Sequence, residues 1–468
     1  MTTSYDARRA DWLIVLGVGV YLCMTRAELK LGSLIFMMVV FACVFGVAKS
    51  WLSTKTTWMV GVVLMFGLLN SWRATNEYHR TNIGQYSGIA KIASDPRNIG
   101  PATRVTLEIE SDRFVVFAYG RQAWRLAGCK MGEQVFVLGY RERFDNQSES
   151  HWRAQHIKGN FRVEIVGEDR FVSSPLMRSA ERVRKLINKG AQSLGFAERS
   201  LFTGLVIGDD TQQSDSMIAA FRDSGLAHLV AVSGQNVSFL LAAISPLVSR
   251  LHSRNRVLLV LVLLAWFVVI TRVEPSVVRA ATMAGLAYLT NSIGRPTRTL
   301  RLIALTVLLN LMLDPLLAWS IGFFMSVGAT LGLCLGAEWM SQVIRRPKWL
   351  GQLVGATISA QLGVMPVVIF VFGLPSATGI IANVLAVPVA GVVMLFGLPL
   401  SLVAGLIVDL GLEKLAIALM WPIRIGVWWV WWVAKNFAAL RFDGLSNLML
   451  WVAVLALIVS VRHRSSSV

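Results

Sequence analysis

Long apolar runs, separated by short polar segments, occupy most of the chain. Three of them precede residue 73, at 12–24, 31–48 and 56–72. Further runs lie at 226–250, 256–272, 277–293, 300–313, 317–340, 350–373, 377–408, 412–434 and 445–461. A helix of about 20 apolar residues crosses a bilayer, and 377–408 is long enough for two, so this pattern predicts a polytopic α-helical membrane protein with about 10–12 transmembrane helices.

Residues 73–175 break this pattern, since they include 15 basic and 12 acidic side chains. Such a charged segment is expected outside the bilayer. Alternation in residues 103–110 places Val105, Leu107 and Ile109 on one face of a strand. Further short strands are expected at 86–92, 114–119, 134–140, 152–157 and 161–166. Turn residues between short strands predict a small inserted β-rich domain, and a five-stranded OB-like barrel fits its size.

Four parts follow from these patterns. Residues 1–72 hold N-terminal transmembrane helices, and residues 73–175 form the β-rich, OB-like soluble domain. Residues 176–200 form a basic amphipathic linker helix, for which a place at the membrane surface is favoured over a contact with nucleic acid. Residues 201–468 form the transmembrane core.

Composition narrows the class of protein. The chain is 55% apolar and 15% charged, whereas soluble domains carry about 25% charged residues, so a soluble enzyme and a disordered chain are excluded. The net charge of +18 fits either cytoplasmic loops enriched in Lys and Arg or a polyanionic partner such as nucleic acid. Loop clusters at 250–256, 295–301, 345–348 and 462–464 account for much of that charge.

The cysteines lack a metal-binding spacing, so we expect neither a metal nor a cofactor.

Basic residues also orient the chain in the membrane. Arg8 and Arg9 precede the first apolar run, and no small-residue cleavage site follows it, so we interpret the run as a retained anchor. Loops rich in Lys and Arg stay on the cytoplasmic side. Three spans that start from the inside place residues 73–175 on the extracytoplasmic side.

Polar side chains inside the predicted spans are candidates for function, because the bilayer makes them costly. One stripe at helical spacing consists of Ser224, His228, Ala231, Gln235, Ser238 and Ala242. Such a stripe lines a water-filled path or packs against another helix. Ser233 and Gly234 interrupt it, and broken helices often build substrate sites at mid-membrane. Ser233 lacks a nucleophile elbow and an orienting acid, so no catalytic residue is expected.

Later spans carry further polar residues. Arg279 lies one turn into the run at 277–293, where it either pairs with Glu274 or contacts a phosphate in a channel. The amides Gln361 and Asn383 also lie inside apolar runs. Prolines within or beside the spans predict kinked helices, which favour a channel or a transporter over a simple anchor bundle.

Short motifs follow one another along the core in a fixed order. The segments are 204–210 (GLVIGDD), 221–234 (FRDSGLAHLVAVSG), 275–279 (PSVVR), 314–315 (DP), 322–326 (GFFMS), 360–361 (AQ) and 382–388 (ANVLAVP). As an ordered set they resemble the competence domain of ComEC-type DNA-internalisation channels. Their structural positions are Gly208, Asp209, Gly225, Pro275, Asp314, Pro315, Gly322, Phe323, Ser326 and Pro388. The resemblance covers residues 201–410, and members of the family often place an OB-type domain before this core.

The resemblance implies a multi-pass channel in the bacterial plasma (inner) membrane that carries single-stranded DNA into the cytoplasm during natural transformation. The implied pore residues are Ser224, His228, Ser233, Gly234, Gln235, Asn236, Arg279, Gln361 and Asn383. Within this set, Arg279 would contact phosphates or hold the pore helices, and the two amides Gln361 and Asn383 would fix kinked helices. The implied partners are a membrane DNA receptor, cytoplasmic DNA-translocation or DNA-binding proteins, and a separate nuclease.

Two departures from the family pattern matter. Asn236 stands where members frequently have histidine, so any role that needs an imidazole there is in doubt. No HxHxDH motif of a metallo-β-lactamase-like domain occurs in the chain, so we expect no degradation of the second strand by it. Two other functions remain open. One is a transporter or scaffold for an anionic envelope polymer or lipid, and the other is a membrane hydrolase or nuclease.

Overall fold

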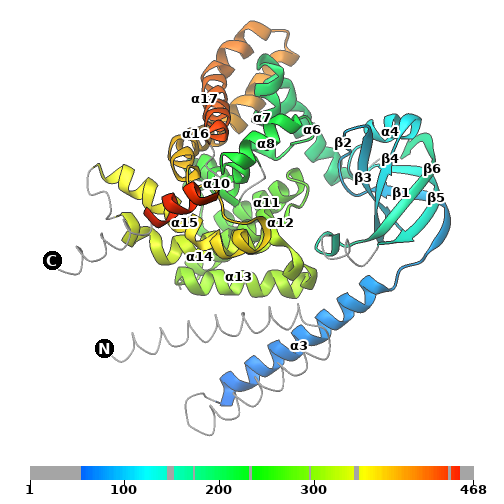
Figure 1. Ribbon diagram of the computed structural model, residues 1–468, viewed down its shortest axis with the longest axis horizontal. Coiled ribbons are helices and arrows are strands. Elements are labelled where there is room, and N and C mark those ends of the chain that lie inside the picture. The colour runs from blue at the N-terminus through cyan, green and yellow to red at the C-terminus, as the bar shows by residue number, and fades with distance from the viewer. Residues whose placement is uncertain are drawn as a thin grey trace. The chain divides into compact units, whose positions relative to one another are not determined.

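The computed structural model describes residues 54–144, 152–171, 174–230, 234–294, 297–341, 347–440 and 444–453 (Figure 1). The expected spans at 12–24 and 31–48, and Ser233, lie outside these residues. The chain divides into two compact units. The barrel unit comprises Met1–Pro175 and Thr297–Phe323, and the helical unit comprises Leu176–Pro296 and Phe324–Val468.

Within the described residues, the β-rich domain of the barrel unit has six strands. They are β1 (Gly84–Ile92), β2 (Arg97–Ile99), β3 (Ala102–Ile109), β4 (Asp112–Ala118), β5 (Gln134–Arg143) and β6 (Ile157–Phe171). Because β1 pairs with both β5 and β3, five strands close into a barrel in the order β1-β5-β6-β4-β3, and β2 adds to β3. The β4–β6 pair is parallel. The inserted β-rich domain is therefore confirmed, whereas its assignment as OB-like stays a prediction.

The alternation along β3 decides which side chains fill the barrel. Val105, Leu107 and Ile109 are fully buried, as their spacing predicts, and Phe114 of β4 and Phe161 of β6 meet them in one cluster. Helix α4 (Gly120–Ala127) packs against β3, β4 and β6, and its Leu126 joins the same cluster (Figure 1). Apolar burial therefore holds the barrel together.

The strand expected at 152–157 is wrong, because β6 begins only at Ile157. The preceding residues form a turn in which the N–H of Gln155 donates to the carbonyl of Trp152 (2.9 Å) and His156 has a φ of 58°. The turn also places the guanidinium of Arg153 over the ring of Trp319, 4.6 Å from its centroid. Turn hydrogen bonds and this cation–π contact therefore replace strand pairing here.

Three helical segments complete the described barrel unit. They are α3 (Thr54–His79), α13 (Thr299–Leu313) and the short 3₁₀ helix η2 (Pro315–Trp319). The hydroxyl of Tyr78 donates to the carbonyl of Ile157 (2.8 Å), and Asn70 Nδ2 donates to the carbonyl of Met312 (2.7 Å). Side chains of α3 thus bond both to β6 and to α13.

Helices make up the described part of the second unit. They are α6 (Pro175–Gly190), η1 (Ala191–Ser193), α7 (Phe196–Ile207), α8 (Asp215–Asp223), α9 (Ala227–Val230), α10 (Gly234–Val248), α11 (Ser253–Ile270), α12 (Pro275–Ser292), α14 (Ile321–Met340), α15 (Lys348–Phe372), α16 (Gly379–Asp409) and α17 (Glu413–Ala439). Among the described residues, α11, α14, α15, α16 and α17 are long and apolar enough to cross a bilayer. The protein is thus a helical membrane protein with an inserted β-rich domain. The total of 10–12 spans stays a prediction.

Glycine allows close contact between α14 and α15. Gly328, Gly332 and Gly336 follow one another at intervals of four and so share one face of α14. A Cβ atom on Gly332 would lie 2.1 Å from the carbonyl oxygen of Ser359, and one on Gly328 would lie 2.5 Å from that of Gly363. Small residues of this kind bring membrane helices into backbone contact, where dispersion attraction and not the hydrophobic effect holds them.

Candidate functional site

The polar stripe that begins at Ser224 does not lie on one helix. Ser224 caps the C-terminus of α8, Gly225 turns the chain with a φ of 76°, and His228 lies on the four-residue helix α9. The remaining described positions of the stripe, Gln235, Ser238 and Ala242, lie on α10. The turn at Gly225, which ends α8 just before the span expected at 226–250, therefore separates Ser224 from the rest of the stripe.

Burial also separates the members of this stripe. Ser224 is fully buried and its hydroxyl donates to the carbonyl of Phe221 (3.2 Å), whereas His228, Ser238 and Ala242 are exposed. Gln235 is half-buried. Exposed and buried side chains cannot belong to one packing face, so the residues of the stripe do not form a single surface.

Arg279 forms the centre of a polar cluster in the helical unit. Its side chain is only 6% exposed, on α12. Nη1 donates to Thr330 Oγ1 of α14 (3.3 Å), and Nη2 donates to Ser326 Oγ one turn earlier on the same helix. One expected alternative was an ion pair between Arg279 and Glu274, and the structure does not show it. Arg279 instead joins α12 to α14 through hydroxyl groups.

Gly234 brings a third helix to this cluster. A Cβ atom at Gly234, the first residue of α10, would lie 2.8 Å from Ala280 Cβ and 3.3 Å from Arg279 Nη2. A larger residue would therefore push α10 away from α12. Three positions from separate segments of the sequence (Gly234, Arg279 and Ser326) thus meet at one point.

A second cluster surrounds the first turn of α16. Around the position that a Cβ atom on Gly379 would take, Gly225 Cα lies at 3.4 Å and Gln361 Nε2 at 3.6 Å. Asn383 is buried, and its Nδ2 donates to the carbonyl of Gly379 (2.7 Å). Gly225, Gln361 and Asn383, which are far apart in the sequence, therefore lie together. Pro388 follows inside α16, in the same helix.

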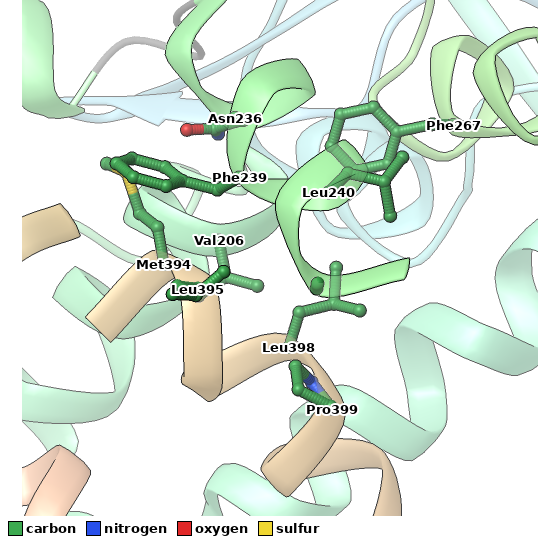
Figure 2. Close-up of a pocket in the computed structure, with 10 residues that line it drawn as sticks. Val206, Asn236, Phe239, Leu240, Phe267, Met394, Leu395, Leu398 and Pro399 are labelled. Atoms are coloured by element: carbon green, nitrogen blue, oxygen red, sulfur yellow. The ribbon is translucent and has the colours of Figure 1, made fainter. Parts of the chain in front are cut away.

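Asn236 lies apart from both clusters, at a small cavity between α10 and α16. Its Nδ2 donates to the carbonyl of Leu205 (3.0 Å), and its Oδ1 is buried with no hydrogen-bond partner among the described residues. Figure 2 shows Asn236 beside Phe239 and Met394 at the edge of this cavity. The cavity of about 20 Å³ has room for about one water molecule, so it is not a path for a polymer.

The motif at Gly208 and Asp209 has a structural role in the helical unit. Gly208 caps α7, and the carboxylate of Asp209 pairs with Arg184 of α6 (3.0 Å). Arg184 is only 4% exposed and also donates through Nη1 to the carbonyl of Ile270 (2.9 Å). This pair therefore links α6, the end of α7 and the end of α11.

The motifs at Asp314 and Gly322 belong to the barrel unit, with the exception of Ser326. Asp314 Oδ1 accepts from the backbone N–H of Leu316 (3.0 Å), and its Oδ2 lies 2.9 Å from His156 Nε2. Pro315 begins η2, and Gly322 and the buried Phe323 lie in the first turn of α14. Pro275 similarly begins α12, where proline is favourable because the first turn leaves its N–H unpaired anyway.

Comparison with known proteins decides the family. The family model described as "Competence protein" matches residues 205–463, which is more than half of the chain. The chain belongs to the competence protein family. A curated relative, ComE operon protein 3 of Bacillus subtilis (strain 168), is 32% identical over 187 residues. That match spans 39% of this chain and 24% of the relative, so the chain matches about a quarter of the relative's length. No solved structure matches the chain.

The description of the family associates this chain with competence. The matched residues include both polar clusters of the helical unit, around Arg279 and around Gly379. The β-rich domain lies before the matched segment. The competence region therefore coincides with the part of the chain in which polar side chains are buried among membrane helices.

Sequence reasoning missed three contact residues of this competence protein. Thr330 follows Ser326 by one helical turn, so its place beside Arg279 could have been found from spacing alone. Arg184 shares the buried face of α6 with Ala180 and Ile187, and a basic residue on an apolar face is a signal of a buried partner. His156 gives no such signal, because its contact with Asp314 depends on the fold.

Proposed function

We propose that this protein is a channel for single-stranded DNA across the bacterial plasma (inner) membrane during natural transformation. The observation that carries the proposal is the helix break at Gly225, between α8 and α9, inside the family-matched segment. Discontinuous helices in a membrane are tolerated where they line a cavity or contact a substrate. The exposed His228 on α9 and the half-buried Gln235 on α10 supply polar groups in the segment that follows this break.

The barrel unit has a separate role in this proposal. On the extracytoplasmic side, its β-rich domain would receive DNA from a membrane DNA receptor and guide it to the channel entrance. Cytoplasmic DNA-translocation or DNA-binding proteins would take up the strand on the other side. We assign no catalytic step to the chain, so a separate nuclease would remove the second strand.

Deletion of the gene tests the channel directly. We expect the deletion strain to bind labelled DNA at its surface but to carry none of it into the cytoplasm, and we expect a plasmid copy to restore uptake. Nuclease-resistant label inside the cells is the measurement. Normal uptake in the deletion strain would contradict the channel and favour transport of an envelope polymer or lipid.

A separate experiment with the purified full chain tests whether the protein cleaves DNA. Incubated with labelled single-stranded DNA and a divalent metal ion, the protein should leave the strand intact on a denaturing gel. Cleavage that copurifies with the protein, and that persists after a second purification step, would replace the channel with the nuclease alternative.

A further inference from the structure

The side-chain amide of Asn236, on α10, has an orientation that its surroundings fix. Its Nδ2 donates to the carbonyl of Leu205 (3.0 Å), and a carbonyl oxygen can only accept a hydrogen bond. The amide nitrogen must therefore face Leu205, and the amide oxygen must face the other way. This oxygen, Oδ1, is buried without a hydrogen-bond partner among the described residues. Because Asn236 is only 5% exposed, bulk solvent does not supply the missing donor.

Two backbone carbonyls near Asn236 lack the donor that a continuous helix would give them. Leu205 lies in the last turn of α7, where the carbonyls have no N–H of their own helix to accept from. On α16, Pro399 follows Leu395 by four residues and has no N–H, so it cannot complete the helical hydrogen bond to the carbonyl of Leu395. Asn236 Nδ2 satisfies the first carbonyl, and the second is left without its regular donor.

The amide of Asn236 and the proline gap in α16 border the same small cavity. Asn236, Leu395 and Pro399 all line it, and Phe239 and Met394 lie beside Asn236 at its edge (Figure 2). Its volume of about 20 Å³ exceeds the about 15 Å³ that one water molecule needs. No residue that lines it carries a charged side chain.

The groups at this cavity select its occupant by their chemistry. Two acceptors cannot bond to each other, so a bridge between them must be a molecule that donates twice. Water donates two hydrogen bonds and has the required size. A metal cation would need more oxygen ligands than these two, and its charge would be buried among apolar side chains at high cost. An apolar occupant would leave both oxygens without a donor.

We propose that one water molecule binds in this cavity and donates to both Asn236 Oδ1 and the carbonyl of Leu395. The water replaces the donor that Pro399 lacks, and ordered water is one of the groups that satisfy backbone freed by proline in membrane helices. It joins α10 to α16, while Asn236 Nδ2 joins α10 to α7. Both polar atoms of Asn236 then bond inside the protein, so this residue links helices and does not contact a transported strand.

A crystallographic density map of the full-length protein, grown in a lipidic mesophase, tests the site directly. We expect one peak inside the cavity, at about 2.8 Å from both Asn236 Oδ1 and the carbonyl oxygen of Leu395. An ordered map of this region without a peak in the cavity would overturn the proposal. So would a direct hydrogen bond from a backbone N–H of α16 to the carbonyl of Leu395.

A double-mutant cycle gives an independent measure in solution. Pro399→Ala restores a backbone N–H for the carbonyl of Leu395, so that carbonyl no longer needs the water. Asn236→Leu removes the other end of the bridge. In the Pro399→Ala background, Asn236→Leu should therefore raise the equilibrium constant of unfolding about fivefold less than it does in the parent, which corresponds to about one hydrogen bond. Denaturant titration of the full-length chain in mixed micelles measures all four proteins.

Pro388→Ala is the matched control for this cycle. Pro388 also lies inside α16 but does not line the cavity, so its replacement should leave the effect of Asn236→Leu unchanged. Equal effects of Asn236→Leu in the parent and in the Pro399→Ala background would overturn the bridge. If Asn236→Leu does not fold, Asn236→Ala takes its place in the cycle with the same expected coupling.

The choice of salt distinguishes water from a bound cation. A water-filled cavity predicts the same unfolding midpoint in sodium chloride and in choline chloride at equal ionic strength. A lower midpoint in choline chloride that Pro399→Ala abolishes would assign the cavity to a sodium ion and overturn the water. These measurements concern stability alone, so their outcome does not depend on whether the protein carries DNA.

Discussion

The barrel unit and the helical unit stabilise themselves by different means. Inside the barrel, the buried cluster consists of apolar side chains such as Leu107 and Phe114, and the buried Thr103 donates to Asn98 Oδ1 (3.0 Å). The helical unit buries polar side chains as well. Among the described residues these include Arg184, Ser200, Thr203, Gln213, Ser224, Asn236, Thr271, Arg279, Ser359, Thr378, Asn383 and Ser401.

Buried polar atoms without a hydrogen-bond partner give a second comparison between the two units. Within the described part of the helical unit, Ser200 Oγ, Asn236 Oδ1, Arg279 Nε and Gln361 Oε1 are buried without a hydrogen-bond partner. A buried polar atom without a partner is costly, and water or a ligand commonly supplies one. Arg141 Nε on β5 of the barrel is also buried without a hydrogen-bond partner, so the two units differ in degree, with more such atoms among the described residues of the helical unit.

The largest expected effect comes from the apolar core of the barrel. Phe114→Ala removes a fully buried ring and leaves a cavity, so we expect the barrel to lose about 4 kcal/mol in free energy of unfolding. Hydrogen exchange of peptides from 102–118, in the full chain, measures the loss. Phe117→Ala is the control on the same strand, since Phe117 is 42% exposed and should cost less than about 0.5 kcal/mol. Similar losses for both variants would mean that burial does not hold the barrel.

Breaking a buried ion pair in the helical unit should cause the second-largest loss of stability. Arg184→Met leaves Asp209 without its cation and removes the donor to the carbonyl of Ile270. Breaking one partner of a buried pair should cost about 3 kcal/mol in free energy of unfolding, measured by denaturant titration in mixed micelles. Adding Asp209→Asn should restore part of that loss, because no unpaired carboxylate then remains.

Arg182→Met serves as the control for this pair. Arg182 lies on the exposed face of α6, so its replacement should change stability by less than about 0.5 kcal/mol. If Arg182→Met and Arg184→Met were equally destabilised, the buried pair would contribute nothing, and the helical unit would depend on apolar contacts as the barrel does.

Sequence reasoning succeeded where a feature depends on local periodicity. The alternation at Val105, Leu107 and Ile109 predicts the barrel interior, and long apolar runs predict membrane helices, because both follow from burial of one face or of a whole segment. The stripe from Ser224 to Ala242 was expected on one helix, because composition in that stretch suits a membrane helix. Only the backbone, with its positive φ, shows the break.

The site could be predicted in part for a different reason. Polar residues inside apolar runs mark Arg279, Gln361 and Asn383 as candidates. Their partners could not be inferred, because Ser326 lies 47 residues from Arg279 and the approach of Gly225 to Gly379 spans still more of the chain. Long-range pairing of this kind is decided by helix packing and leaves no trace in local spacing.

The smallest expected effect on stability comes from Gly→Ala changes where helices pack closely. The sign of this effect shows whether the site has room for a methyl group. In a helix, alanine is favoured over glycine by about 1 kcal/mol, so a Gly→Ala change stabilises a helix that has room for the methyl group. Gly322 of α14 has room, because the nearest atom to its added Cβ lies 3.9 Å away. Gly332, on the same helix, does not.

We therefore expect the two substitutions to act in opposite directions. Gly332→Ala would place its methyl group 2.1 Å from the carbonyl oxygen of Ser359, so α14 and α15 must separate, at a cost of about 2 kcal/mol. Gly322→Ala should be neutral or slightly stabilising in the same micelle titration. If Gly332→Ala also stabilised the protein, backbone contact between α14 and α15 could not be what holds them. The helical unit would then depend on its buried polar pairs, and the contrast with the barrel would rest on those pairs alone.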